Sequence, residues 1–276
     1  MSDFVFFGTG GLLSSICLDK LVENKLFPQH VFIQANKHSN FPNLTEIVCQ
    51  RAPIPYSLID SMHTEDNILK LKQLNPSFGI VASFGEIFKK SILSLFPIYN
   101  VHTGKLPENR GAYPVFWKII ENEDVFSVSI HRVEEKIDAG EVLLIREGDF
   151  SNLVFSNDFF TAFYNLAAEA LIQVIEKIRT SSLHALPVDE TKAHYYPKFT
   201  EADFALNPEE DINLLHKKIN RLQFYGNPTI LNYALTESSI LYNHPIDIKQ
   251  HHITVISKNS VVLKNSSGIL LIKHLT

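Results

Sequence analysis

The sequence predicts an α/β protein with a mainly parallel sheet, followed by a small domain built only of strands. Three observations support this prediction. A short apolar run near the N-terminus ends in a glycine-rich turn and leads into a helical pattern, which is typical of the opening of a β-α-β unit. Strand and helix patterns then alternate up to about residue 180, as in parallel sheets. After residue 229 only short strand-like segments remain.

The first strand is expected at residues 4–7, which are all apolar and end at the turn Gly8–Gly11. Residues 78–83 form another apolar run, typical of a strand that is covered on both faces. The strongest helical period lies at 156–179, whereas the stretch 36–63 is mixed. Further strands are expected at 31–35, 99–102, 126–133 and 142–147, and further helices at 12–21, 65–74, 113–122 and in a short piece ending near 95.

The chain changes character after about residue 185. Residues 194–198 have no period and are expected to be a linker, and a helix is expected at 211–222. The sequence at 265–268, Asn-Ser-Ser-Gly, indicates a hairpin. We expect strands at 229–235, 239–242, 253–257, 261–264 and 268–273. The predicted parts are an α/β domain over 1–185, a linker and helix over 186–228, and a small β-strand domain over 229–276.

The composition excludes several classes of protein. The 276 residues are 45% hydrophobic and 20% charged, with a net charge of −5, which argues against a nucleic-acid partner. Cys17 and Cys49 have no metal-ligand spacing, so no metal is expected. The N-terminus lacks the basic start and apolar core of a signal peptide, and no apolar run approaches the roughly 20 residues of a membrane span. We therefore expect a cytoplasmic protein with no membrane partner.

Three polar side chains are the candidates for catalysis. Asn100 and His102 are two residues apart, so they point to the same side of a strand. Asp138 follows 36 residues after His102, which is far enough for one crossover back to the same edge of a parallel sheet. An amide, an imidazole and a carboxylate can together stabilise an oxyanion, accept a proton and orient the base. The spacing alone somewhat favours the other interpretation, a capped strand with a solvent-facing histidine and a turn aspartate.

The sequence around these residues resembles a known family. Ala82-Ser-Phe-Gly-Glu-Ile87, Asn100-Val-His102, Leu106-Pro107, Arg110-Gly111 and Ile137-Asp-Ala-Gly140 occur in the order and spacing of the 10-formyltetrahydrofolate-dependent formyltransferases. The resemblance covers about residues 1–180. It implies a Rossmann-like formyltransferase fold, 10-formyltetrahydrofolate as co-substrate, and Asn100, His102 and Asp138 as the catalytic residues. Whether His102 or Asp138 is the primary proton acceptor stays open.

The resemblance also implies binding residues. The loop formed by Ser83, Phe84, Gly85, Glu86 and Ile87 is expected to bind the pterin, although a plain turn at the end of a strand has the same pattern. The turn formed by Gly8, Thr9, Gly10 and Gly11 precedes a helix and is a candidate for a phosphate contact, with a plain tight turn as the alternative. Lys105, Arg110 and Tyr113 are expected near the substrate, the alternative being a solvated loop. His131, on an alternating strand, is assigned a structural role.

Within this family, Gly104, Arg110-Gly111 and the aromatic residue before Pro114 are more similar to the nucleotide-sugar N-formyltransferases than to the enzymes that act on tRNA. Residues 200–276 hold seven Lys and Arg and seven Asp and Glu, a poor surface for binding tRNA. This branch implies a dTDP-linked 4-amino-4,6-dideoxy sugar as acceptor, a role in O-antigen synthesis and a homodimer. The alternatives are methionyl-tRNA or another amine, a dTDP-3-amino or UDP-4-amino sugar, and a catalytically silent nucleotide-binding protein.

Overall fold

The computed structural model describes residues 3–35, 42–231, 233–241 and 252–275. The chain forms two compact units, which are interleaved along the sequence. The first comprises Met1–Pro114, Phe126–Gly148 and Thr161–Tyr196, and the second comprises Val115–Val125, Asp149–Phe160 and Pro197–Thr276. The division into three consecutive parts stays a prediction.

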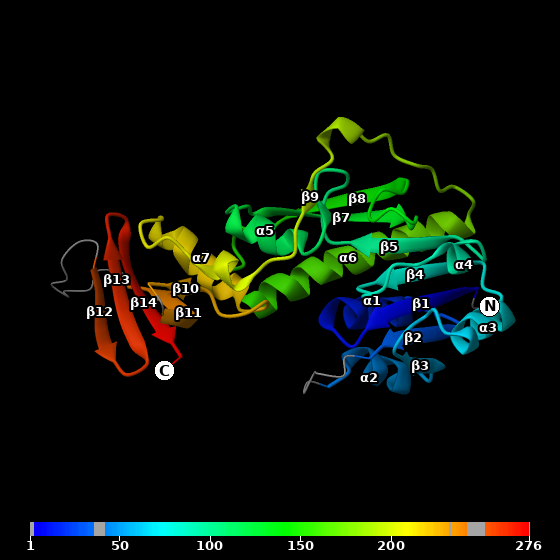
Figure 1. Ribbon diagram of the computed structural model, residues 1–276, viewed down its shortest axis with the longest axis horizontal. Helices are drawn as coiled ribbons and strands as arrows, with labels where there is room; N and C mark the ends of the chain where they lie inside the picture. The colour runs from blue at the N-terminus through cyan, green and yellow to red at the C-terminus, as the bar shows by residue number, and fades with distance from the viewer. Residues whose placement is uncertain (1–2, 36–41, 232, 242–251, 276) are drawn as a thin grey trace. The chain divides into compact units, whose positions relative to one another are not determined.

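The first unit is organised by a mixed, mostly parallel sheet (Figure 1). Its strand order is β3-β2-β1-β4-β5-β7-β8. Strands β1 to β5 pair in parallel, and β7 pairs antiparallel with β5. The Rossmann-like fold predicted from the sequence is therefore confirmed. The strands are β1 (Phe4–Thr9), β2 (His30–Gln34), β3 (Tyr56–Ile59), β4 (Phe78–Ala82), β5 (Ile98–His102), β7 (Val125–Arg132) and β8 (Val142–Asp149).

Successive residues of a strand point to opposite sides of the sheet. Because the central strands are apolar at consecutive positions, both faces of the sheet are apolar. On one face Val5 and Phe7 of β1 belong to a buried cluster with Leu71 and Ile92, from α3 and α4. On the other face Phe126 of β7 contacts the ring of Phe163 from the long helix α6. The helices of this part of the chain are α1 (Leu12–Glu23), α2 (Leu44–Arg51), α3 (Glu65–Leu74), α4 (Lys90–Leu93), α5 (Pro114–Ile120) and α6 (Ser156–Arg179).

Two elements lie in the mixed stretch 36–63, where none was assigned from the sequence. Helix α2 has only eight residues and is capped by Asn43, whose side chain accepts the N–H of Glu46. Strand β3 lies at the edge of the sheet and exposes Leu58, so its apolar alternation is weak. Short elements at the edge of a sheet bury little apolar surface and leave little periodicity to detect.

The segment expected to be a linker holds a short strand. Strand β9 (Tyr195–Tyr196) pairs in parallel with β6 (Arg110–Gly111). The pairing was not predicted, because a strand of two residues shows no alternation. It connects the loop after β5 to residues more than 80 positions further along the chain.

The second unit contains an antiparallel sheet with the order β10-β11-β14-β13-β12, and α7 (Ile212–Leu222) packs on β11. The small all-β region and its hairpin are confirmed, since Asn265 pairs with Gly268. The break expected between 235 and 239 is wrong, because β11 is continuous; residue 242 lies outside the described residues. The strands are β10 (Thr229–Ile230), β11 (Tyr233–Ile240), β12 (His252–Ser257), β13 (Ser260–Asn265) and β14 (Gly268–His274).

Arg221 of α7 connects three separate segments of this unit. Its side chain is only 1% exposed and forms an ion pair with Asp124, with Nη1 3.1 Å from Oδ1. Its Nε donates to the backbone oxygen of Leu153 at 2.9 Å and its Nη2 to that of Phe150 at 2.6 Å. A buried guanidinium that satisfies two carbonyls and a carboxylate is costly to remove, because those acceptors then lose their donor.

We predict that Arg221→Met lowers the free energy of unfolding by about 3 kcal/mol, because buried acceptors lose their partner. The matched control is Lys273→Met, which removes the exposed Lys273–Glu237 pair of the same unit and is expected to cost less than about 1 kcal/mol. Urea unfolding followed by circular dichroism measures both variants. Equal losses in the two variants would contradict this role of Arg221.

Candidate active site

Two neighbouring strands carry the polar side chains of the site. Asn100 and His102 lie on β5 and face the same side, as predicted. In the antiparallel register with β7, Asn100 is opposite His131 and His102 is opposite Ser129. Four polar side chains therefore share one face of this strand pair.

Asp138 lies close to these residues, but the connection that brings it there differs from the one predicted from the sequence. It lies in the loop between β7 and β8, and its Oδ1 is 3.7 Å from Nδ1 of His102 and 3.5 Å from Nε2 of His131. The expected crossover to a parallel strand is wrong, because β7 runs antiparallel to β5. The spacing of 36 residues is taken up by α5 and a returning strand.

The backbone of Asp138 is held in an unusual conformation. Its φ is 51°, in the left-handed region that a residue with a Cβ rarely adopts. The N–H of Gly111 donates to Oδ2 at 2.9 Å, and Nε of Arg110 donates to the backbone oxygen of Asp138 at 2.8 Å. These bonds fix both the carboxylate and the peptide group behind it.

His102 is placed to accept a proton. It is only 6% exposed, and its Nε2 lies 2.6 Å from the backbone oxygen of Asn109. A carbonyl oxygen only accepts, so Nε2 carries the hydrogen and Nδ1 of the neutral ring has a lone pair. Burial lowers the pKa of His102 and outweighs the carboxylate of Asp138, which raises it. At neutral pH the ring is uncharged, and its free Nδ1 faces Asp138.

Asp138 stays ionised beside this ring. Burial raises the pKa of the Asp138 carboxyl, but its polar neighbours His131, His102 and the N–H of Gly111 outweigh burial. The net result is a pKa below the usual range of an aspartate. The site thus combines a neutral base with a negative charge that would stabilise the protonated form of that base.

His131 is a site residue that the sequence analysis assigned only a structural role. Its Nδ1 is 2.9 Å from the backbone oxygen of Arg132 and therefore donates, which leaves Nε2 as an acceptor. The side-chain N–H of Asn100 donates to this Nε2 at 3.0 Å. One N–H of the Asn100 amide is thereby fixed, and the other is available to a ligand. The alternation of β7 gave no sign of this contact, which depends on the register with β5.

The loop after His102 is folded tightly against the ring. Ser129 Oγ donates to the backbone oxygen of Gly104 at 2.7 Å and accepts the N–H of Leu106 at 3.0 Å. A Cβ on Gly104 would lie 2.9 Å from Cβ of Asn109 and 3.1 Å from Nε2 of His102. Only glycine allows this close approach of the loop to the imidazole.

The predicted pterin loop, Ser83–Ile87, follows β4. The N–H of Gly85 donates to Oε1 of Gln34 at 2.7 Å, and Oε2 of Glu86 accepts the N–H of Met62 at 2.6 Å. Phe84 packs into the apolar cluster beside Phe88. Ile87 is 56% exposed. The loop is therefore held in place by its neighbours and presents Ile87 to the outside.

The predicted phosphate turn, Gly8–Gly11, ends β1. The N–H of Thr9 donates to Ser14 Oγ at 2.9 Å, and that of Gly11 donates to Thr9 Oγ1 at 3.3 Å. A Cβ on Gly8 would approach Ser14 to 2.9 Å, whereas Gly10 adjoins Asn43. Thr9 Oγ1 also donates to Ser83 Oγ at 3.5 Å, so this turn and the predicted pterin loop are neighbours.

The three side chains expected near the substrate differ in their surroundings. Lys105 is partly exposed and lies 3.3 Å from a carboxylate oxygen of Glu147. Tyr113 is 48% exposed, with a φ of 54°. Arg110 is 3% exposed and is bound to Asp138 and Glu190. Lys105 and Tyr113 are accessible to a ligand, and the guanidinium of Arg110 is engaged inside the protein.

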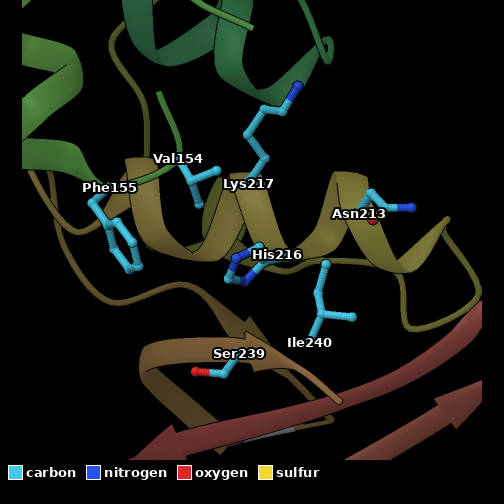
Figure 2. A pocket seen from close by; sticks show the side chains of 7 residues that line it. All are labelled: Val154, Phe155, Asn213, His216, Lys217, Ser239 and Ile240. Atoms are coloured by element: carbon cyan, nitrogen blue, oxygen red, sulfur yellow. The ribbon is translucent and has the colours of Figure 1, made fainter. Parts of the chain in front are cut away.

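A separate hollow of about 420 Å³ lies within the second unit, beside α7 and β11 (Figure 2). Figure 2 shows the ring of His216 among its lining side chains and the side chain of Lys217 pointing away from them. Lys217 forms a salt bridge with Asp124. None of the lining residues belongs to the predicted site. The described residues contain no group of three metal-binding side chains and no helix long and apolar enough to cross a bilayer.

Several known proteins are similar to this chain in sequence or in fold. A methionyl-tRNA formyltransferase from Kosmotoga olearia is 27% identical over 282 residues, which cover 98% of this chain and 90% of that protein. WlaRD, a sugar 3N-formyl transferase solved with dTDP and 5-N-formyl-THF, has a TM-score of 0.70 at 16% identity, covering 100% of this chain and 98% of that one. An N-formyltransferase from Helicobacter canadensis, solved with folinic acid and dTDP-3-aminofucose, has a TM-score of 0.67 at 16% identity, covering 99% of each chain. The family model described as formyl transferase matches residues 4–175, which is more than half of the sequence, and the chain therefore belongs to the formyl transferase family.

Proposed function

We propose that this formyltransferase moves the formyl group of 10-formyltetrahydrofolate to the amine of a dTDP-linked 4-amino-4,6-dideoxy sugar. The observation that carries the proposal is the convergence of Asn100, His102 and Asp138 in one cluster around the buried ring of His131. Formyl transfer to an amine needs a hydrogen-bond donor that stabilises the oxyanion and a base that accepts the proton of the amine. These three side chains supply both.

The roles follow from the contacts of each residue. The free N–H of the Asn100 amide donates to the oxyanion that forms when the amine attacks the formyl carbon, while His131 holds the other N–H. The lone pair on Nδ1 of His102 accepts the proton that the amine loses. Asp138 stabilises the resulting imidazolium across 3.7 Å. His102 then returns the proton to the folate nitrogen as the bond from this nitrogen to the formyl carbon breaks.

The two substrates are assigned to different loops. Ser83, Phe84, Gly85, Glu86 and Ile87 would hold the pterin, because their loop is fixed by neighbouring strands and exposes Ile87. WlaRD and the Helicobacter canadensis enzyme were both solved with folate derivatives, which supports a folate as the formyl donor.

The nucleotide-sugar would lie against the turn formed by Gly8, Thr9, Gly10 and Gly11, with Lys105 and Tyr113 as accessible side chains. Arg110 was expected in the same group, but its guanidinium is hydrogen-bonded to Asp138 and Glu190.

The charge of the C-terminal residues supports a sugar as acceptor. Residues 200–276 carry seven basic and seven acidic residues, a balance that does not favour a polyanion such as tRNA. Both structural neighbours described above were solved with dTDP or a dTDP-sugar. The second candidate acceptor is methionyl-tRNA, which is favoured by the similarity to the Kosmotoga olearia enzyme over 98% of this chain.

Three further properties belong to the same proposal. A nucleotide-sugar acceptor places the enzyme in the cytoplasm, where such sugars are made, and assigns its product to O-antigen and lipopolysaccharide synthesis. The sugar-modifying branch also implies a homodimer, which light scattering coupled to size-exclusion chromatography would test.

The acceptor is tested with a panel. The protein is incubated with 10-formyltetrahydrofolate and, separately, with dTDP-4-amino, dTDP-3-amino and UDP-4-amino sugars and with methionyl-tRNA. We predict a mass gain of one formyl group on the dTDP-4-amino sugar. Gain only on a 3-amino or UDP-linked sugar would correct the acceptor, and gain only on tRNA would overturn the sugar assignment.

The roles in the site are tested by variants and by pH. We predict that Asn100→Ala lowers kcat by about 10²–10³-fold and that His102→Asn lowers it by about 10²–10⁴-fold.

Because His102 must be neutral, the rate falls as the pH drops through its pKa, and we expect the midpoint of this fall below 6.5. Asp138→Asn should move the midpoint still lower, because the carboxylate raises the pKa of His102. A midpoint that is unchanged in Asp138→Asn would exclude this pairing.

We predict that His131→Ala lowers kcat by roughly tenfold to a hundredfold, because the Asn100 amide loses the acceptor that orients it. The KM for the folate should stay within about twofold. The control is Ser127→Ala, on the same strand, which removes a contact with Glu147 at 3.2 Å. Steady-state kinetics measure both variants, and equal kcat values for the two would disprove the role of His131.

A further inference from the structure

The guanidinium of Arg110 is engaged inside the protein. The side chain is 3% exposed, and Nε donates to the backbone oxygen of Asp138 at 2.8 Å. One terminal nitrogen, Nη2, donates to Oε1 of Glu190 at 2.8 Å. The guanidinium carbon lies 5.7 Å from the centre of the Tyr195 ring. Arg110 therefore connects the loop of a catalytic residue with residues that lie far along the chain.

Asp138 needs such support. A left-handed backbone is uncommon for a residue with a Cβ, and at Asp138 surrounding contacts hold this conformation in place. The carboxylate is held by the N–H of Gly111 and the peptide oxygen by Arg110. Without the bond from Arg110, the carboxylate remains anchored by one bond while the backbone behind it can relax.

Arg110 in turn is held by the segment around β9. The N–H of Arg110 donates to the backbone oxygen of His194 at 2.9 Å, and that of Ala112 donates to Tyr196 at 3.1 Å. Gly111 has a φ of 93°, and a Cβ there would collide with the backbone of Tyr196. The backbone of β6 thus has a fixed position, and Glu190 fixes the direction of the guanidinium from the same segment.

We propose that Arg110 and Glu190 are positioning residues for formyl transfer, which hold Asp138 at its distance from His102. Arg110 acts through the backbone of Asp138, and Glu190 acts through Arg110. The inference rests on the proposed role of Asp138 at His102 and adds residues 190–196 to the structure that supports the site.

The test uses the full-length enzyme and variants that keep the positive charge of Arg110. This matters because Asp138, His131 and Arg110 all act on the pKa of His102, and removing the arginine charge would itself raise that pKa. Glu190→Ala removes the anchor, and Arg110→Lys keeps the charge but cannot bridge Asp138 and Glu190 with a planar fork. Glu190→Gln retains an oxygen that accepts the hydrogen bond. Lys192→Ala, in the same short turn, is the matched control.

Two readouts are measured for each variant. Steady-state kinetics give kcat and KM on whichever acceptor the wild type formylates, and an NMR titration of the His102 ring, assigned with His102→Asn, gives its pKa without substrate. We expect Glu190→Ala and Arg110→Lys to lower kcat about tenfold, with the folate KM within about twofold, and to lower the pKa of His102. Glu190→Gln and Lys192→Ala should match the wild type.

The outcomes separate the two proposals. A His102 pKa and kcat that are unchanged in both Glu190→Ala and Arg110→Lys would overturn the positioning role. A wild type that formylates none of the acceptors would refute the proposed function, and the NMR titration would still decide whether Arg110 and Glu190 hold Asp138. A fall in kcat alone, with the pKa of His102 unchanged, would indicate a general loss of structure and would count against the inference.

Discussion

Strand β7 runs antiparallel to β5, and the register of this pair decides which side chains lie beside Asn100 and His102. It places His131 opposite Asn100 and Ser129 opposite His102. One partner orients the amide and the other supports the loop that covers the imidazole. A shift of one residue would turn both partners to the opposite face of the sheet, because side chains alternate along a strand. The chemistry of the site therefore depends on backbone pairing.

The electrostatics of the site follow from the same packing. Burial keeps His102 neutral, whereas Asp138, at a similar depth, stays charged because the N–H of Gly111 and its other polar neighbours outweigh burial. A base must be uncharged before reaction and is stabilised by a negative neighbour afterwards. Burial disfavours the charged form of both groups, but only Asp138 has neighbours that offset it, and the neutral base and its negative neighbour lie within 3.7 Å of each other.

Local patterns predicted much of this arrangement. The helix over 156–179 was predicted with both ends correct, because its apolar period is unbroken over 24 residues. Asn100 and His102 were placed on one side of a strand by alternation alone. The direction of β7 was not predictable, because the residues between His102 and β7 can form either a crossover or a return. The roles of His131 and Arg110 depend on partners distant in sequence, so nothing near them in the chain indicated those roles.

The small parallel pairing of β6 with β9 also affects how the enzyme folds. The proposed catalytic residues Asn100, His102 and Asp138 are close in sequence, so the loop that brings them together is short. The Arg110–Glu190 bond spans 80 positions and requires closure of a longer loop, whose entropic cost is higher. During synthesis on the ribosome, the proposed catalytic residues are made well before Glu190, which holds Arg110. A newly made chain therefore passes through a stage in which the proposed catalytic residues have been synthesised but Glu190, the partner of Arg110, has not.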